Sequence, residues 1–140
     1  DQVIEKRENM SISKIFEIKN EEYFRKIEKR ESLNTLEKEN CIIALGGGAF
    51  INKEIRDSVK KNSISFWLNL NVEFLMKRLS DSKKRPLLKF EDLEKNLEVI
   101  LQERKDIYKL ANFKIDCNHN SKTIITNKII KLYETQQNKS

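Results

Sequence analysis

Three short apolar segments, at 41–45, 64–70 and 113–117, are separated by longer segments with helical periodicity. The first reads CIIAL and shows no polar alternation, which is typical of a parallel strand covered on both faces. Strands that alternate with helices favour βαβ units, so we expect an α/β fold with a parallel sheet. Helices are expected in five segments: 20–39, 52–61, 71–79, 90–111 and 121–134.

All three glycines of the 140-residue chain, Gly46, Gly47 and Gly48, follow the first of these apolar segments directly. Glycine loses more backbone entropy on folding than any other residue, so three in a row need a reason. A tight turn explains one glycine, whereas three indicate a backbone that must approach something closely. Ligands of open α/β sheets bind at the carboxyl ends of strands, which is where this turn is expected.

The composition excludes several classes of protein. The chain carries 28 basic and 22 acidic residues, but its positive charge is dispersed, so we expect no nucleic-acid partner. Cys41, Cys117 and the single His119 form neither a disulfide framework nor a metal site, and both cysteines are expected to be buried thiols. No apolar run is long enough for a membrane span, which predicts a soluble cytoplasmic protein that binds no membrane.

Four short motifs occur in a fixed order: FRKIE at 24–28, GGGA at 46–49, RPLL at 85–88 and RKDIY at 104–108. Each is weak alone, but together, over residues 1 to 133, they make the chain resemble shikimate kinase. The resemblance implies a P-loop kinase that transfers the γ-phosphoryl group of ATP to the 3-hydroxyl of shikimate, with Mg²⁺. It also implies a monomer and a three-layer α/β/α domain, over residues 1–136, before a disordered tail at 137–140.

The family's parallel sheet has the strand order 2-3-1-4-5, and the three apolar segments would be its third, fourth and fifth strands. Members of the family begin with a strand, a G-x-x-x-x-G-K-[ST] loop, a helix and a second strand that ends in D-x-D. Here Asp1 aligns with the second of those aspartates, so the phosphate loop and the Mg²⁺ ligands have no counterpart in the chain. We therefore expect residues 1–140 alone neither to fold stably nor to phosphorylate shikimate, and we assign no metal ligand within them.

The resemblance assigns roles to individual residues. Asp1 would accept a hydrogen bond, and a proton, from the reacting hydroxyl. Arg25 would bind the shikimate carboxylate or a ring hydroxyl, and Arg104 would make a bidentate contact with the carboxylate. Glu28, one helical turn from Arg25, would hold its guanidinium. The turn at Gly46, Gly47 and Gly48 would contact shikimate. Without the resemblance, Arg25 and Glu28 would be an ordinary exposed ion pair.

Three further residues would contact ATP. Arg85, in a loop with the only proline, Pro86, would close over the phosphates and stabilise charge in the transition state. Arg78 would stack on adenine, and Asn120 would lie in the loop beside it. Asn120 stands where many members have arginine, and Asp106, Lys109 and Asn20 also depart from the common residues of the family.

Two alternatives remain open. The first is a related small-molecule kinase that resembles gluconate kinase; two substrate-facing arginines favour a carboxylated substrate. The second, from another class, is a non-catalytic remnant or interaction module without a phosphate loop.

Overall fold

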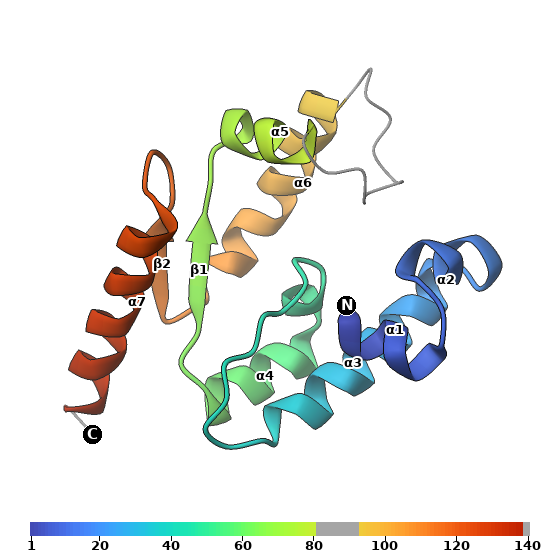
Figure 1. The fold of residues 1–140 in the computed structure, drawn as a ribbon, viewed down its shortest axis with the longest axis horizontal. Coiled ribbons are helices and arrows are strands. Elements are labelled where there is room, and N and C mark those ends of the chain that lie inside the picture. Colours follow the sequence, from blue (N-terminus) through green and yellow to red (C-terminus); the bar gives the residue numbers. More distant parts are fainter. Residues whose placement is uncertain (81–92, 139–140) are drawn as a thin grey trace. The chain divides into compact units, whose positions relative to one another are not determined.

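The computed structural model describes residues 1–80 and 93–138, apart from the side chains of Leu79 and Ser80. Within it the chain divides into two compact units, Asp1–Ser63 and Ile64–Ser140. The first unit contains α1 (Gln2–Glu8), α2 (Ile12–Ile18), α3 (Glu21–Leu36), the 3₁₀ helix η1 (Ala49–Ile51) and α4 (Lys53–Asn62). The second contains β1 (Phe66–Asn69), α5 (Val72–Ser80), α6 (Leu93–Tyr108), β2 (Phe113–Asp116) and α7 (Lys122–Gln137) (Figure 1).

The first unit has two apolar clusters, one at each end of α3. At its amino end, Phe24 and Ile27 pack with Ile4 of α1 and Ile15 of α2, all four buried. At its carboxyl end, Leu36 packs with Ala49, Ile55 and Val59 of η1 and α4. Helix α3 therefore connects the N-terminal helices to the glycine turn and α4.

The sequence did not predict α1 and α2. In α2, Ser11 caps the helix by accepting a hydrogen bond from Lys14 N–H at 3.2 Å, and Ile12, Ile15 and Phe16 form its apolar side. Each helix has only seven residues, too short for a clear periodic signal, and such helices depend on tertiary packing. Here the packing is that of Ile4 and Ile15 against α3.

The strand expected at 41–45 is not formed: residues 41–46 have no regular secondary structure. A strand needs a hydrogen-bonded neighbour, and in the described part of the chain the only ladder is that between β1 and β2. Ile42 is fully exposed. Cys41 is exposed too, so its expected burial is wrong, whereas Cys117 is buried as predicted.

The other two predicted strands are confirmed. Strands β1 and β2 pair in parallel, with Phe66 opposite Phe113 and Asn69 opposite Asp116. These are the strands expected to be fourth and fifth, and therefore adjacent, in the sheet. Together with the helices between them, they establish the α/β class.

An asparagine lies just outside each end of β2 and bonds to the corresponding end of β1. Asn112 Oδ1 accepts hydrogen bonds from Ser65 N at 2.9 Å and Ser65 Oγ at 2.7 Å. At the carboxyl end, Asn118 Oδ1 accepts from Asn71 N at 2.9 Å. The two asparagines fix the register of the strand pair from both sides.

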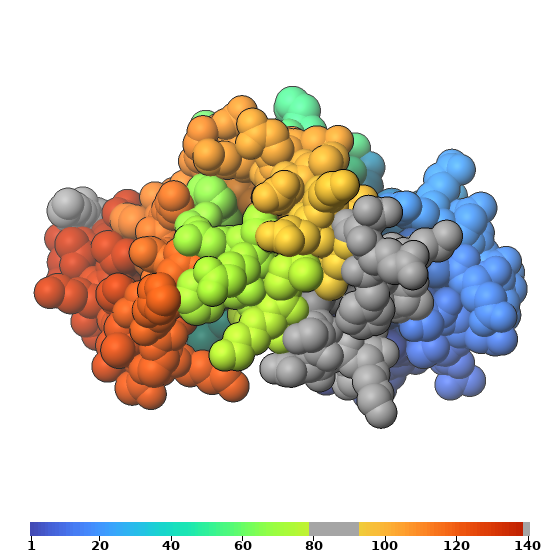
Figure 2. All heavy atoms as spheres, turned by 90° about the horizontal axis from the view of Figure 1, so that it is seen from above, coloured from blue at the N-terminus to red at the C-terminus, as the bar shows by residue number. Residues whose placement is uncertain are grey.

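The expected helices of the second unit are present. Helices α5 and α6 contact each other, and the space-filling view shows their yellow-green and orange side chains in contact (Figure 2). Helix α7 continues to Gln137, the first residue of the tail that was expected to be disordered. Among the described residues, no helix is long and apolar enough to cross a membrane.

Candidate functional site

Arg25 lies on α3 between two carboxylates. Its Nη1 donates to Glu28 Oε2 at 2.7 Å, and its Nε and Nη2 donate to Glu21 Oε1 at 3.2 and 3.0 Å. Glu28 is buried and Arg25 is partly buried. The predicted pairing of Arg25 with Glu28 is therefore present, with Glu21 as an additional partner one turn earlier.

The glycine turn packs directly on this ion pair. A Cβ added to Gly48 would overlap with Nη1 of Arg25 and would lie 2.8 Å from its Cζ and 3.0 Å from its Nη2. A Cβ added to Gly46 would lie 3.0 Å from Glu28 Oε1. The structure thus brings together four of the predicted site residues from two segments of the first unit.

The reason for the glycines is contact with side chains and not an unusual backbone. None of the three has a positive φ, and Gly48 has φ −77° and ψ −30°, which any residue adopts. The glycines do allow a close approach, but the group approached within this chain is the Arg25–Glu28 pair, and contact of the turn with a bound ligand stays a prediction. The absence of a Cβ leaves room for the guanidinium to lie against the main chain.

The charge of Arg25 is stabilised by its surroundings. Burial alone would lower the pKa of the guanidinium, but the hydrogen bonds and negative charges of Glu28 and Glu21 outweigh this effect and raise the pKa. Arg25 is therefore a permanent cation with hydrogen-bond donors, held at a partly exposed position, and is suited to binding a carboxylate.

Asp1 is exposed and occupies the N-cap position of α1, where its side chain makes no capping hydrogen bond. Helix α1 is attached to α3, the helix of Arg25, through Ile4 and through Arg7, which donates to both carboxylate oxygens of Glu31 at 2.7 and 2.6 Å. Asp1 and Arg25 are thus carried by two helices that pack together, although no hydrogen bond joins their side chains among the described residues.

Arg104 lies on α6 in the second unit and is half-buried. One turn later on the helix, the ring of Tyr108 lies 5.9 Å from that of Trp67 on β1. Within residues 1–80 and 93–138, no carboxylate forms an ion pair with Arg104. A half-buried arginine with this environment can accept an anionic ligand, as the sequence predicts.

The two predicted adenine-side elements lie close together in the second unit. The ring of Phe74 on α5 meets that of His119 edge-on, with centroids 4.6 Å apart. Burial raises the pKa of the Cys117 thiol, as does the charge of Asp116, while the positive charge of Arg78 acts in the opposite direction. The positive charge of Arg78 on α5 therefore acts on Cys117, which directly precedes the loop that contains Asn120.

Asn120 is used within its own loop. Its Nδ2 donates to the carbonyl oxygens of Asp116 at 3.1 Å and Asn118 at 2.9 Å. Only its Oδ1 is left for a nucleotide contact. Asn120 therefore contributes mainly by stabilising the conformation of its own loop. Arg85, and with it the RPLL motif, lies outside the described residues.

Two side-chain contacts, those of Glu21 with Arg25 and of Asn118 with Asn71, were missed from the sequence. Glu21 could have been found from its position four residues before Arg25, a spacing that allows a helical ion pair. Asn118, which joins the end of β2 to the start of α5, had no such signal, because its partner Asn71 lies far away in the sequence.

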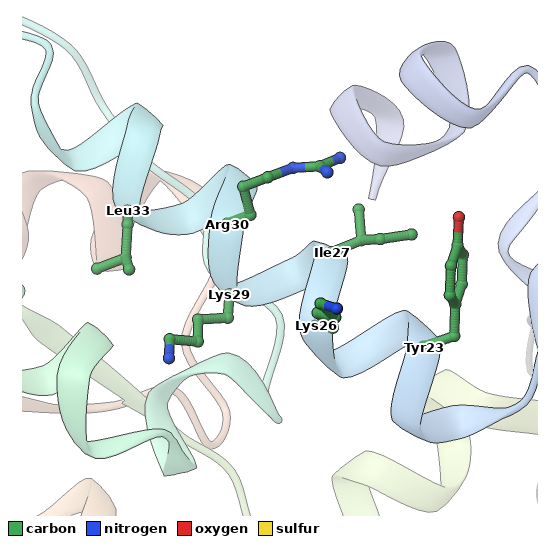
Figure 3. A pocket seen from close by; sticks show the side chains of 6 residues that line it. All are labelled: Tyr23, Lys26, Ile27, Lys29, Arg30 and Leu33. Carbon is green, nitrogen blue, oxygen red and sulfur yellow. The ribbon is translucent and has the colours of Figure 1, made fainter.

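A groove on α3 is a separate feature (Figure 3). Lys29 extends from it to Glu54 of α4, to which it donates at 2.5 Å. Arg25 does not line this groove of about 460 Å³, which is formed by Tyr23, Lys26, Ile27, Lys29, Arg30 and Leu33. Across the described residues, no three metal-ligating side chains cluster.

Comparisons with family models, with individual proteins and with solved structures all indicate the same family. The sequence matches the family model for shikimate kinase over residues 1–134. It is 36% identical over 131 residues to a shikimate kinase of Bartonella henselae, covering 94% of this chain and 62% of that protein. A shikimate kinase of Caldanaerobacter subterraneus is 35% identical, with 95% and 78% coverage.

Among solved structures, the shikimate kinase of Acinetobacter baumannii in complex with shikimate superposes with a TM-score of 0.91 at 29% identity. The match covers 97% of this chain and 76% of that one. The chain therefore spans nearly two thirds of the length of its Bartonella relative and about three quarters of the solved structure.

Proposed function

Since this chain belongs to the shikimate kinase family, we propose that it forms the shikimate-binding part of an enzyme that phosphorylates the 3-hydroxyl of shikimate with ATP. The observation that carries this proposal is the packing of Gly48 on Arg25, whose guanidinium is held by Glu28. A fixed cation beside an accessible turn suits a small carboxylated substrate. The solved relative that binds shikimate supports the same choice.

The substrate's carboxylate would be bound by Arg25 and Arg104, because planar guanidinium groups donate two parallel hydrogen bonds to a carboxylate. The turn formed by Gly46, Gly47 and Gly48 would line the substrate-binding site. Asp1 would accept the hydrogen bond of the 3-hydroxyl and take its proton as the hydroxyl oxygen attacks the γ-phosphorus. Phosphoryl transfer depends mainly on such positioning and on charge stabilisation.

ATP supplies the phosphoryl group. Arg78, with the loop that Asn120 closes, would hold the adenine side, and Arg85 would neutralise charge on the transferring group. Mg²⁺ is inferred from the resemblance alone, and we assign none of its ligands to this chain. We further infer, from the resemblance and composition, a cytoplasmic monomer that acts on a small molecule, with no nucleic-acid or membrane partner.

A kinase that acts on gluconate is the second candidate. Gluconate also has a carboxylate, but it is an open chain, whereas the family match and the relative bound to shikimate favour the cyclic acid. A non-catalytic role is the third, and the match to the shikimate kinase family argues against it.

The test is ADP release by the protein expressed from its complete gene, measured with ATP and either shikimate or gluconate. We expect release that depends on shikimate and is much slower with gluconate. ADP release that depends on gluconate would establish the second candidate. If folded protein releases no ADP with shikimate or with gluconate, the third candidate is established.

A further inference from the structure

Glu21 and Glu28 hold Arg25 in different ways. Glu28, whose side chain is 9% exposed, accepts one short hydrogen bond of 2.7 Å from Nη1. Glu21, whose side chain is 63% exposed, accepts from both Nε and Nη2 at 3.2 and 3.0 Å. One carboxylate is thus a buried support, and the other lies at the solvent side of the guanidinium.

The edge that Glu21 occupies is one on which a carboxylated ligand can bind. Nε and Nη2 together form one of the two edges on which a guanidinium donates parallel hydrogen bonds to a carboxylate. On the other edge, Nη1 already donates to Glu28. A carboxylated substrate that binds Arg25 through two hydrogen bonds must therefore compete with Glu21 or share a nitrogen with Glu28.

The two carboxylates differ in how readily they can leave. Glu28 is enclosed by the glycine turn, since a Cβ on Gly46 would lie 3.0 Å from its Oε1. Glu21 is in the first turn of α3, and its ion pair with Arg25 has the i, i+4 spacing of exposed helical pairs, which are weak. Glu21 can turn into solvent without disturbing the packing, whereas Glu28 cannot.

We propose that Glu21 acts as an internal competitor: it occupies Arg25 in the substrate-free protein and is displaced by the substrate's carboxylate. It thereby sets the affinity for the substrate, while Glu28 keeps the guanidinium in place. This inference rests on the proposed function, because it takes Arg25 as the substrate-binding group.

The test compares Glu21→Gln with Glu22→Gln in the protein expressed from its complete gene. Both changes remove one negative charge from an exposed position in the first turn of α3, but Glu22 makes no hydrogen bond to Arg25. In calorimetric titrations, Glu21→Gln should bind shikimate about two- to fivefold more tightly than the wild type. Glu22→Gln should bind as the wild type does, and unchanged or weaker binding in Glu21→Gln would overturn the inference.

A second measurement separates this inference from the proposed function. Sodium acetate, compared with sodium chloride at the same ionic strength, is titrated against the NMR signal of Arg25 Nε–H. We expect the chemical shift of Arg25 Nε–H to reach half of its total change at an acetate concentration about two- to fivefold lower in Glu21→Gln than in the wild type. Equal titrations would refute the competition, whereas expected acetate titrations without any shikimate binding would refute the proposed function alone.

Discussion

At the scale of single residues, Gly48 determines where the guanidinium of Arg25 can lie. Its backbone angles are those of ordinary helical residues, so an alanine would fit the main chain. An alanine would leave no room for the guanidinium of Arg25, because its Cβ would overlap with this group. The glycine is needed for the position of another side chain.

Gly48→Ala should therefore damage binding without damaging the fold. Arg25 can move aside because its guanidinium is the end of a flexible side chain, but it then loses its alignment with the substrate. We expect the KM for shikimate to rise about ten- to a hundredfold, from steady-state kinetics, while the melting temperature stays within a few degrees.

Gly46→Ala provides the comparison for this prediction. Its Cβ would lie 3.0 Å from Glu28 Oε1, a close contact that requires a smaller shift than the overlap at Gly48, so the rise in KM should be smaller. If Gly48→Ala left KM unchanged, or if the two alanines had equal effects, the packing of Arg25 on Gly48 would have no functional importance.

The resemblance to shikimate kinase grouped Arg25 and Glu28 with the glycine turn. Motif spacing contributed only the one-turn separation of the two charges in FRKIE. It could not show that the glycines face this pair, since that contact joins segments distant in sequence. The exposure of Cys41 was also unpredictable, because burial of a strand depends on its neighbours, which the sequence of the strand does not contain.

At the scale of elements, a network of charges attaches α1 to α3. Arg7 and Arg30 both donate to Glu31, at 2.6 to 2.9 Å, and the Glu31 side chain is buried. Burial alone would raise the pKa of Glu31, but the hydrogen bonds and charges of the two arginines outweigh it and lower the pKa. The ionised carboxylate is thus stabilised in the folded state.

This shift predicts how stability depends on pH. A pKa lower in the folded than in the unfolded chain means that Glu31 contributes stability above its ordinary pKa of about 4.3, and that the contribution is lost as the pH falls through the folded value. Urea unfolding should show a larger difference between wild type and Glu31→Gln at pH 7 than at about pH 3.5. A difference that does not change with pH would contradict this account.

The two asparagines at the ends of β2 allow a matched test of the nucleotide side. Asn118 lies at the carboxyl end of the strand pair and bonds to Asn71 just before α5, whereas Asn112 bonds to Ser65 at the opposite end. Ligands of parallel sheets bind at carboxyl ends. Only the loss of Asn118 should therefore disturb the loop that contains Asn120.

In steady-state kinetics, Asn118→Ala should raise the KM for ATP about fivefold, which corresponds to roughly one lost hydrogen bond. Asn112→Ala should lower stability by a similar amount, about 1 kcal/mol, and leave this KM unchanged. Equal effects of the two substitutions on the KM for ATP would mean that the loop does not contact the nucleotide.

At this scale the sequence predicted the elements with strong patterns. The paired strands and the five longer helices were all predicted and all are present, although the apolar side of the helix expected at 20–39 is irregular. Helices α1 and α2 were missed because seven residues carry too little periodicity, and 41–45 was overpredicted because an apolar run alone does not make a strand.

At the scale of the whole molecule, the proposed activity needs parts that residues 1–140 do not supply. All three glycines are consecutive in the chain, so it contains no G-x-x-x-x-G-K-[ST] loop for the phosphates of ATP. That residues 1–140 alone are inactive and unstable therefore stays a prediction. The single domain over 1–136 also stays a prediction, because the chain forms two compact units, Asp1–Ser63 and Ile64–Ser140.

The central claim is that Arg25 binds the carboxylate of shikimate. Its most direct test is calorimetric titration of shikimate into the protein expressed from its complete gene and into two variants, Arg25→Lys and Arg30→Lys. Both substitutions exchange a guanidinium for an ammonium on α3, but Arg30 pairs with Glu31 and Glu8 instead of facing the glycine turn. We predict that Arg25→Lys weakens binding by about 1.5–3 kcal/mol, roughly ten- to a hundredfold, and that Arg30→Lys binds as the wild type does. Unchanged shikimate affinity in Arg25→Lys would contradict the account.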